Sequence, residues 1–175
     1  MSPAAELGAK LFFALWPGEA VRAALAAWSR ELRALCGGRA PQPQDLHLTL
    51  AFLGSVESDR VGAIERAAGE VTPPSATLVL DRPGFWKHNR IVWAGASSPP
   101  PELETLVLGL RGALARSGVA FDAKRFVSHV TLLRDAREPA SLPALEPIRW
   151  NVEGLVLAGS AQQRSGSRYE VLRAW

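Results

Sequence analysis

Two His-x-Thr tripeptides contain the residues of this 175-residue chain that are best suited to chemistry. His47 and Thr49 lie in one apolar run, and His129 and Thr131 lie in a second. The chain has three histidines, so two of the three occupy matched contexts. Histidine titrates near neutral pH, and a pair can therefore supply a proton acceptor and a proton donor to one reaction.

Such a pair suits in-line displacement at the phosphorus atom of a phosphodiester. One imidazole would activate the attacking water, and the other would protonate the leaving oxygen. A residue two positions after a histidine shares its face on a β-strand. We therefore expect the Thr49 and Thr131 hydroxyls to hydrogen-bond the non-bridging phosphate oxygens, so that four residues do the work without a metal.

Other chemistries fit the sequence less well. No cluster of Cys, His and carboxylate residues flanks either motif as a zinc site requires. No Gly-x-Ser-x-Gly elbow marks a serine nucleophile. Cys36 follows an apolar helical pattern and is expected to be a buried thiol rather than a nucleophile. His88 lies between Lys87 and Asn89 and is expected on the surface.

Composition sets the broad class of protein. The hydrophobic content of 47% provides a core, and no apolar run approaches the roughly 20 residues of a membrane span. The start at Met1 lacks the pattern of a signal peptide. A single cysteine fits the reducing cytoplasm, where we expect the protein to act. The net charge of +3 comes mainly from arginine, which favours phosphate but does not by itself require an anionic ligand.

Periodicity predicts the elements that carry the motifs. An apolar helical stripe runs from Val21 through Leu25, Trp28 and Leu32 to Leu35, and a second helix follows Pro99 with a similar stripe. We expect residues 81–89 to form a loop, and Ser58 to cap a further helix. Strands are expected at residues 10–16, 46–53, 77–80, 90–96, 121–134, 150–158 and 169–172, with a turn before the last.

The faces of the motif strands follow from strict alternation. His47, Thr49, Ala51 and Leu53 would share the groove face, and the opposite apolar face, including Phe52, would be the core face.

Arg134 follows His129 by five positions, so strict alternation puts it on the opposite face of the strand. A bulge or a strand end would return it to the groove. A phosphate contact and a surface ion pair therefore both remain open for Arg134.

An internal repeat links the two motifs. A strand at 11–16, a helix and a strand at 46–53 match a strand at 91–96, a helix and a strand at 129–134, which places His129 82 positions after His47. A period of this length indicates two duplicated lobes rather than a stacked array. A pseudo-twofold relation between the lobes would bring both His-x-Thr strands to one central groove.

The motifs resemble the paired signatures of the 2H phosphoesterases, within which they are most similar to the RNA 2′,3′-cyclic phosphodiesterases, also described as 2′-5′ RNA ligases. The residues that carry the resemblance are the runs at 47–54 and 129–135, supported by 11–15, 90–95 and 167–172. The family often has proline where this chain has Ser128. Arg134 matches a family arginine and is a substrate-binding candidate.

This resemblance implies an α+β fold in which one domain over residues 1–175 contains two duplicated β-α-β lobes, with antiparallel sheets flanking a central cleft. It implies hydrolysis of an RNA 2′,3′-cyclic phosphate end, or of a small cyclic nucleotide, to a 2′-phosphomonoester. It makes His47 the proton donor and His129 the proton acceptor, roles that the nearly symmetric motifs alone do not distribute. No cofactor, membrane or obligate protein partner is implied.

Three further interpretations stay open at this point. Ligation of RNA through a 2′-5′ linkage would be the reverse reaction. A related enzyme could act on 2′-5′ oligonucleotides, and a non-catalytic RNA-binding module could keep the cleft. Phe85 and Trp86 could stack a base, although we expect them to pack between the lobes.

Overall fold

The computed structural model describes residues 10–73, 75–160 and 168–175. Over this part of the chain, helices pack on antiparallel sheets, which confirms the expected α+β class. The elements in order are β1 (Lys10–Leu15), α1 (Glu19–Cys36), η2 (Pro43–Asp45), β2 (Leu48–Ser55), η3 (Ser58–Arg60), α2 (Val61–Gly69), β3 (Ser75–Leu80), β4 (Arg82–Trp86), β5 (Ile91–Gly95), α3 (Pro101–Arg116), β6 (His129–Leu133), β7 (Ile148–Glu153), β8 (Val156–Ser160) and β9 (Tyr169–Ala174).

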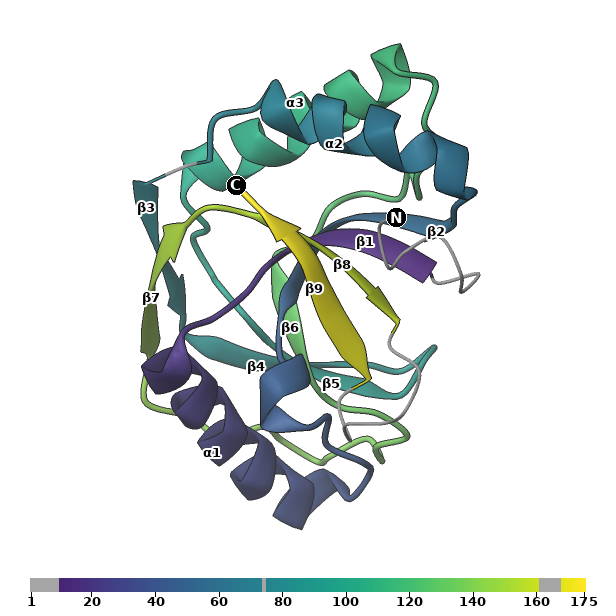
Figure 1. The fold of residues 1–175 in the computed structure, drawn as a ribbon. Helices are drawn as coiled ribbons and strands as arrows, with labels where there is room; N and C mark the ends of the chain where they lie inside the picture. Colours follow the sequence, from purple (N-terminus) through teal and green to yellow (C-terminus); the bar gives the residue numbers. More distant parts are fainter. Residues whose placement is uncertain (1–9, 74, 161–167) are drawn as a thin grey trace.

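Two sheets carry the His-x-Thr strands. One has the strand order β2-β1-β8-β9 and the other the order β4-β5-β6, and β3 pairs with β7 beside them (Figure 1). In the first sheet β1 lies between β2 and β8, and in the second β5 lies between β6 and β4. The expected repeat therefore appears as two antiparallel units, β1-α1-β2 and β5-α3-β6.

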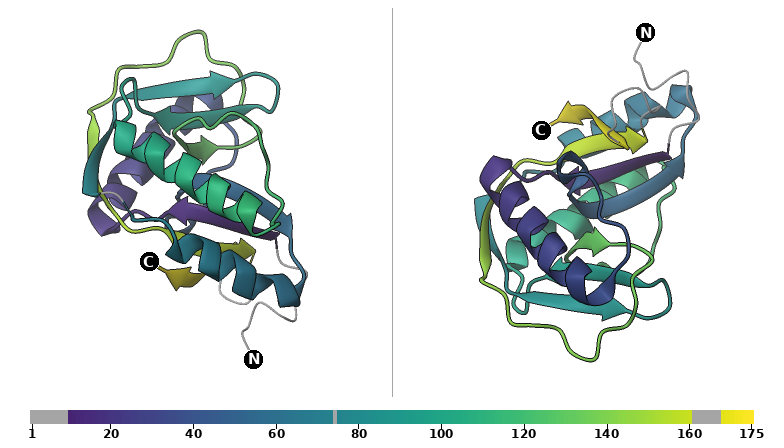
Figure 2. Two further views of the ribbon diagram at one scale, coloured as in Figure 1. Left: turned by 90° about the horizontal axis from the view of Figure 1, so that it is seen from above. Right: turned by 90° about the horizontal axis from the view of Figure 1, so that it is seen from below.

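Each long helix crosses to the motif strand of the other unit. Helix α1 contacts β6 and β7, whereas α3 contacts β2 and β3. The two helices lie at opposite ends of the molecule in Figure 1, so that α3 is in front when the molecule is seen from above and α1 is in front when it is seen from below (Figure 2). These contacts hold the two units together, because each His-x-Thr strand has its apolar face covered by a helix from the other unit.

Apolar residues on these helix faces form the core. On α1 the buried residues include Leu25, Trp28 and Leu32. The expected stripe fails at its end, because Leu35 is 53% exposed and Cys36 points into the core instead. Burial of Cys36 is as expected, and it raises the pKa of the thiol.

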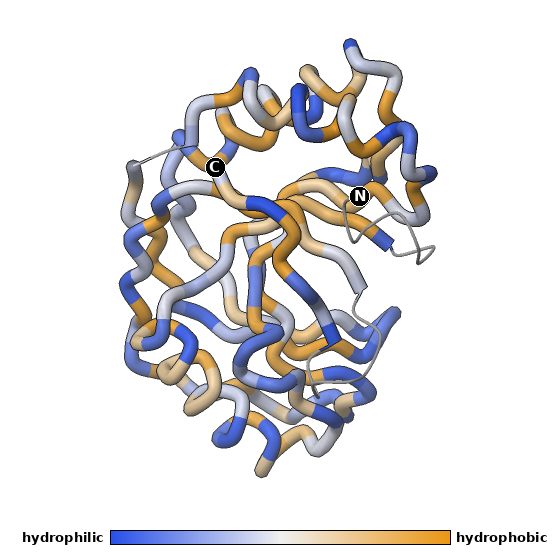
Figure 3. Tube along the Cα trace, in the orientation of Figure 1, coloured by the Kyte–Doolittle hydropathy of each residue, from blue (hydrophilic) through white to orange (hydrophobic). Residues whose placement is uncertain are grey.

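One hydrophobic cluster includes residues of both sheets and of all three α-helices of the described residues. The central strands are predominantly hydrophobic, and the helices alternate between hydrophobic and hydrophilic residues (Figure 3). A shared core is what one domain requires. The expectation of a single domain over residues 1–175 stays a prediction.

The expected loop at residues 81–89 is wrong, because β4 occupies Arg82–Trp86 and pairs with β5. Alternation over so short a segment, interrupted by Pro83 and Gly84, gave no strand signal.

The strand expected at residues 150–158 is two strands, β7 and β8. Gly154 separates them with a φ of 80°, a left-handed conformation that favours glycine. The second His-x-Thr strand, expected within residues 121–134, is β6 and begins at His129.

Ser58 begins a 3-10 turn ahead of α2 and caps neither element through its side chain, so the expected cap is also wrong. The chain start at residues 1–3 and most of the turn before β9, at residues 161–167, lie outside the described residues.

Candidate functional site

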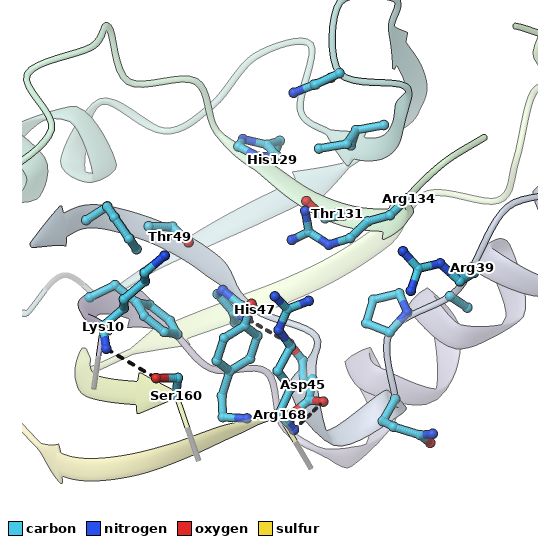
Figure 4. Close-up of a pocket in the computed structure, with 18 of the residues that line it drawn as sticks. Lys10, Arg39, Asp45, His47, Thr49, His129, Thr131, Arg134, Ser160 and Arg168 are labelled. Carbon is cyan, nitrogen blue, oxygen red and sulfur yellow. Dashed lines mark hydrogen bonds between the residues drawn. The ribbon is translucent and has the colours of Figure 1, made fainter. Parts of the chain in front are cut away.

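A cleft of about 710 Å³ between the two motif-bearing sheets contains both motifs (Figure 4). Every site residue expected from the sequence lines it: both histidines, both threonines and Arg134. The full lining is Lys10, Phe12, Arg39, Ala40, Pro41, Gln42, Asp45, His47, Thr49, Phe52, Trp86, Asn89, Ile91, Asp122, His129, Thr131, Arg134, Ser160, Arg168 and Tyr169. His88 is not among these residues and is exposed, as expected.

Both imidazole rings are held by the same local bond. The Nδ1 atom of His47 lies 2.6 Å from the carbonyl oxygen of Asp45, and that of His129 lies 2.8 Å from the carbonyl oxygen of Val127. A carbonyl oxygen only accepts, so Nδ1 carries the hydrogen in each ring. Each neutral ring therefore keeps its unprotonated Nε2 for exchange with a ligand.

A β-bulge returns Arg134 to the cleft. Thr131 pairs with Trp93 and Leu133 pairs with Val92, so Leu132 is an extra residue in β6. One extra residue reverses the faces that follow it. The Ser29 hydroxyl of α1 donates a 2.7 Å hydrogen bond to the Leu132 carbonyl and is itself buried.

The same irregularity occurs at the equivalent place in β2. Thr49 pairs with Ala14 and Ala51 pairs with Phe13, which leaves Leu50 as the extra residue. Ala51 is consequently buried and Phe52 is 41% exposed on the cleft side.

The expected groove face was therefore wrong beyond Thr49. Phe52 belongs to the cleft, while Ala51 and Leu53 belong to the core.

Burial dominates the electrostatics of the two histidines. The pKa of His47 is lowered to about 4, chiefly by desolvation and also by the Arg134 and His129 charges, against the opposing bond to the Asp45 carbonyl. The pKa of His129 is also lowered, first by burial and then by Arg134. Both rings are therefore neutral at pH 7 in the free protein, and a bound anion would favour protonation.

Aromatic rings surround His47 more completely than His129. Trp16 stacks on His47 with a centroid distance of 5.1 Å and an interplanar angle of 6°. Phe12 and Tyr169 contact the same ring at 4.8 and 5.1 Å. His129 meets the edge of Trp86 at 4.5 Å. Trp86, expected to pack between the lobes, thus contacts a candidate catalytic ring.

Several cleft residues carried no signal in the sequence. Arg39 is held at the cleft by two reciprocal backbone hydrogen bonds with Arg134, with N–O distances of 2.8 and 2.9 Å. The buried carboxylate of Asp45 accepts the backbone N–H groups of Arg168, at 3.0 and 3.2 Å, and of Tyr169, at 3.3 Å. These contacts join residues more than ninety positions apart, and only a knowledge of the fold could have revealed them.

The described residues contain neither a candidate metal site nor a helix that could span a membrane. No three His, Cys, Asp or Glu side chains there are grouped so that they could hold a metal ion. No helix among them has the length and apolar character needed to cross a bilayer.

Known proteins resemble this chain both in sequence and in structure. The family model described as "LigT like Phosphoesterase" matches residues 15–93. A protein of Escherichia coli named "RNA 2′,3′-cyclic phosphodiesterase" is 36% identical over 168 residues, covering 95% of each chain. One of that name from Thermus thermophilus is 31% identical and covers 93% of this chain and 87% of its own length. The crystal structure of Escherichia coli LigT complexed with 3′-AMP superposes with a TM-score of 0.86 at 36% identity, covering 95% of this chain and 97% of that one.

Proposed function

The chain belongs to the LigT-like phosphoesterase family, and from that premise we propose that it hydrolyses RNA 2′,3′-cyclic phosphate ends to 2′-phosphomonoesters. The observation that carries the proposal is the matched pair of imidazoles in one cleft, each with Nδ1 bound to a backbone carbonyl and Nε2 left for exchange. Relatives at 36% and 31% identity are named for this reaction, and a solved relative is complexed with 3′-AMP.

His129 takes a proton from water in the proposed reaction, and the water oxygen forms a bond to phosphorus. The bond from phosphorus to the 3′ oxygen breaks, and His47 donates its proton to that oxygen. The products are a free 3′-hydroxyl and a 2′-phosphomonoester. In the free protein the pKa of His47 is lowered to about 4, so in this scheme the bound substrate anion raises that pKa and protonates the ring before His47 donates.

Thr49, Thr131 and Arg134 stabilise the charge on the non-bridging oxygens in this scheme. The threonines lie two positions after the histidines and line the same cleft, and the bulge at Leu132 brings the Arg134 guanidinium there. Preorganised donors aimed at a developing oxyanion contribute a large share of catalysis in such sites. This donor set consists of imidazoles, hydroxyls and a guanidinium, so the proposed reaction needs no metal. Attack by an RNA 5′-hydroxyl on the cyclic phosphate would give the reverse, 2′-5′ ligation reaction.

The test is incubation of the protein with a 2′,3′-cyclic-ended oligonucleotide in EDTA, followed by product analysis with phosphorus NMR. We expect a 2′-phosphomonoester, and a loss of kcat of at least about 100-fold in both His47→Gln and His129→Gln. His88→Gln is the matched control and keeps the wild-type rate. A 3′-phosphate product, dependence on added metal, or full activity in either cleft variant would refute the proposal. A 2′-5′ linked dinucleotide in parallel tests the alternative substrate.

A further inference from the structure

The two ends of the cleft differ in charge. One end, here called the arginine end, contains Arg39, Arg134 and Arg168. The other end contains Lys10 and Phe52 near the end of β2. In Figure 4 the three arginines lie to the right of His47. Lys10 lies to the left of His47, beside Thr49. The pseudo-symmetry of the histidines and threonines therefore does not extend to the cleft ends.

The equivalent bulges of β2 and β6 create this difference. Phe52 and Arg134 each follow a histidine by five positions, and each is returned to the cleft by the extra residue before it. Because β2 and β6 are related by the repeat, the same position falls at opposite ends of the cleft. Arginine stands at one end where phenylalanine stands at the other.

Backbone contacts fix Arg39 at the arginine end. The reciprocal bonds between Arg39 and Arg134 bring the loop after α1 against the end of β6. Gly38 makes this approach possible, since a Cβ at this position would lie 2.6 Å from the Arg134 carbonyl oxygen and its φ is 82°. The Arg39 guanidinium also pairs with the exposed Asp135 carboxylate.

A different contact fixes Arg168. Its backbone N–H donates to the buried Asp45 carboxylate, so the first described residue after the segment 161–167 is held at the cleft. Among the described residues no carboxylate forms an ion pair with the guanidinium of Arg134 or Arg168. Within the part of the chain that the structure describes, both arginines therefore line the cleft without an ion-paired carboxylate.

We propose that Arg39 and Arg168 bind the phosphate on the 5′ oxygen of the nucleotide that carries the cyclic end. This inference rests on the proposed function, in which Arg134 and the two motifs hold the cyclic phosphate itself. Guanidinium groups match phosphate oxygens through paired donors. Arg39 and Arg168 line the same end of the cleft as Arg134, and we assign the next phosphate of the strand to this end because the guanidinium groups gather there (Figure 4). The protein therefore prefers an oligonucleotide end to a free cyclic nucleotide.

The experiment compares kcat/KM for three substrates: a nucleoside 2′,3′-cyclic phosphate, the same compound with a 5′-phosphate, and a trinucleotide with the cyclic end. We expect the trinucleotide to exceed the first by at least about tenfold. The 5′-phosphorylated compound carries a phosphomonoester at the position where the trinucleotide carries a phosphodiester. Comparison of these two substrates therefore shows whether any 5′-phosphate is sufficient or a diester is required. In the double variant R39Q/R168Q the preference ratio falls toward one, and the loss appears mainly in KM for the trinucleotide.

Salt dependence and a control variant complete the test. The KM for the trinucleotide should rise with salt concentration more steeply than the KM for the mononucleotide. Removal of each phosphate-binding guanidinium should reduce the slope of log KM against log salt concentration by about 0.7. Arg116→Gln, on α3 and paired with Glu70, is the matched control and leaves the ratio unchanged. Equal wild-type kcat/KM for the three substrates, or an unchanged ratio in R39Q/R168Q at unchanged Tm, overturns the inference. Failure of the proposed function is distinct, because then no cyclic phosphate is hydrolysed.

Discussion

The His47 half and the His129 half place the same groups in the same order. In each half an imidazole Nδ1 bonds the carbonyl two positions earlier, at Asp45 and Val127. In each half a threonine follows two positions later, and the next residue is an extra one in the strand. Matched backbones thus deliver two imidazoles in matched orientations.

The surroundings of the two rings differ. His47 is enclosed by Trp16, Phe12 and Tyr169, whereas His129 contacts Trp86 and is less deeply buried. The carbonyl that holds His47 belongs to a buried residue whose carboxylate is itself bound to β9. The carbonyl that holds His129 belongs to Val127, which is 44% exposed. Duplicated strands therefore provide shared geometry, and unshared neighbours give each ring its own acidity.

The largest expected effect is on stability in acid. The pKa of His47 is lowered from 6.5 to about 4, chiefly by burial, so between these pH values the unfolded chain binds a proton that the folded chain does not. The free energy of unfolding therefore falls as pH falls through this window, by about 3 kcal/mol at 1.36 kcal/mol per pKa unit. His47→Phe removes this dependence, which urea unfolding at a series of pH values measures.

His129→Phe is the control for that experiment. The pKa of His129 is lowered in the same direction, but fewer aromatic rings enclose His129, so this variant should relieve less of the acid sensitivity. Equal pH dependence in His47→Phe and His129→Phe would show that the two rings are solvated alike, and the comparison would lose its basis.

A second expected effect concerns the two residues, Asp45 and Val127, whose backbone carbonyls hold the histidine rings. Asp45→Ala removes the acceptor of the Arg168 and Tyr169 N–H groups, and orphaned buried donors cost about 1–3 kcal/mol. We expect kcat to fall about tenfold, since the carbonyl that orients His47 loses its support. Val127→Ala changes stability by about 0.5 kcal/mol or less, because Val127 is exposed.

Unfolding curves and steady-state kinetics on both variants measure the difference. Asp45→Asn keeps one acceptor oxygen and should give an intermediate loss. Equal losses in Asp45→Ala and Val127→Ala would mean that the carboxylate anchor contributes nothing specific to the His47 half.

The sequence predicted the features that depend on local periodicity. The strand–helix–strand repeat, the buried stripe of α3 and the position of Thr49 and Thr131 beside their histidines all follow from side-chain spacing. The family and fold class were likewise predictable, because the paired motifs recur at a characteristic separation.

The bulges marked the limit of that reasoning. Strict alternation put Phe52 in the core and Arg134 away from the groove, and one extra residue at Leu50 and at Leu132 reversed both. A bulge is stabilised by tertiary partners, here the Ser29 hydroxyl from α1, that no local pattern reveals. The anchors at Asp45 and Arg39 escaped prediction for the same reason.

The smallest expected effect is a shift in pH dependence common to both halves. Burial is the main reason that both imidazole pKa values are low, and the Arg134 charge lowers each of them further. Arg134→Met removes that charge and should raise both pKa values only in part, because the burial is retained. The proposed reaction requires one protonated and one neutral ring, so kcat/KM should fall below the lower and above the higher of the two pKa values. Both limbs of the pH profile should therefore move to higher pH together, and NMR titration of the imidazole protons should show the same shift in each ring. Movement of one limb alone would show that the Arg134 charge affects the pKa of only one histidine. The two halves would then differ in their charge environment as well as in their burial.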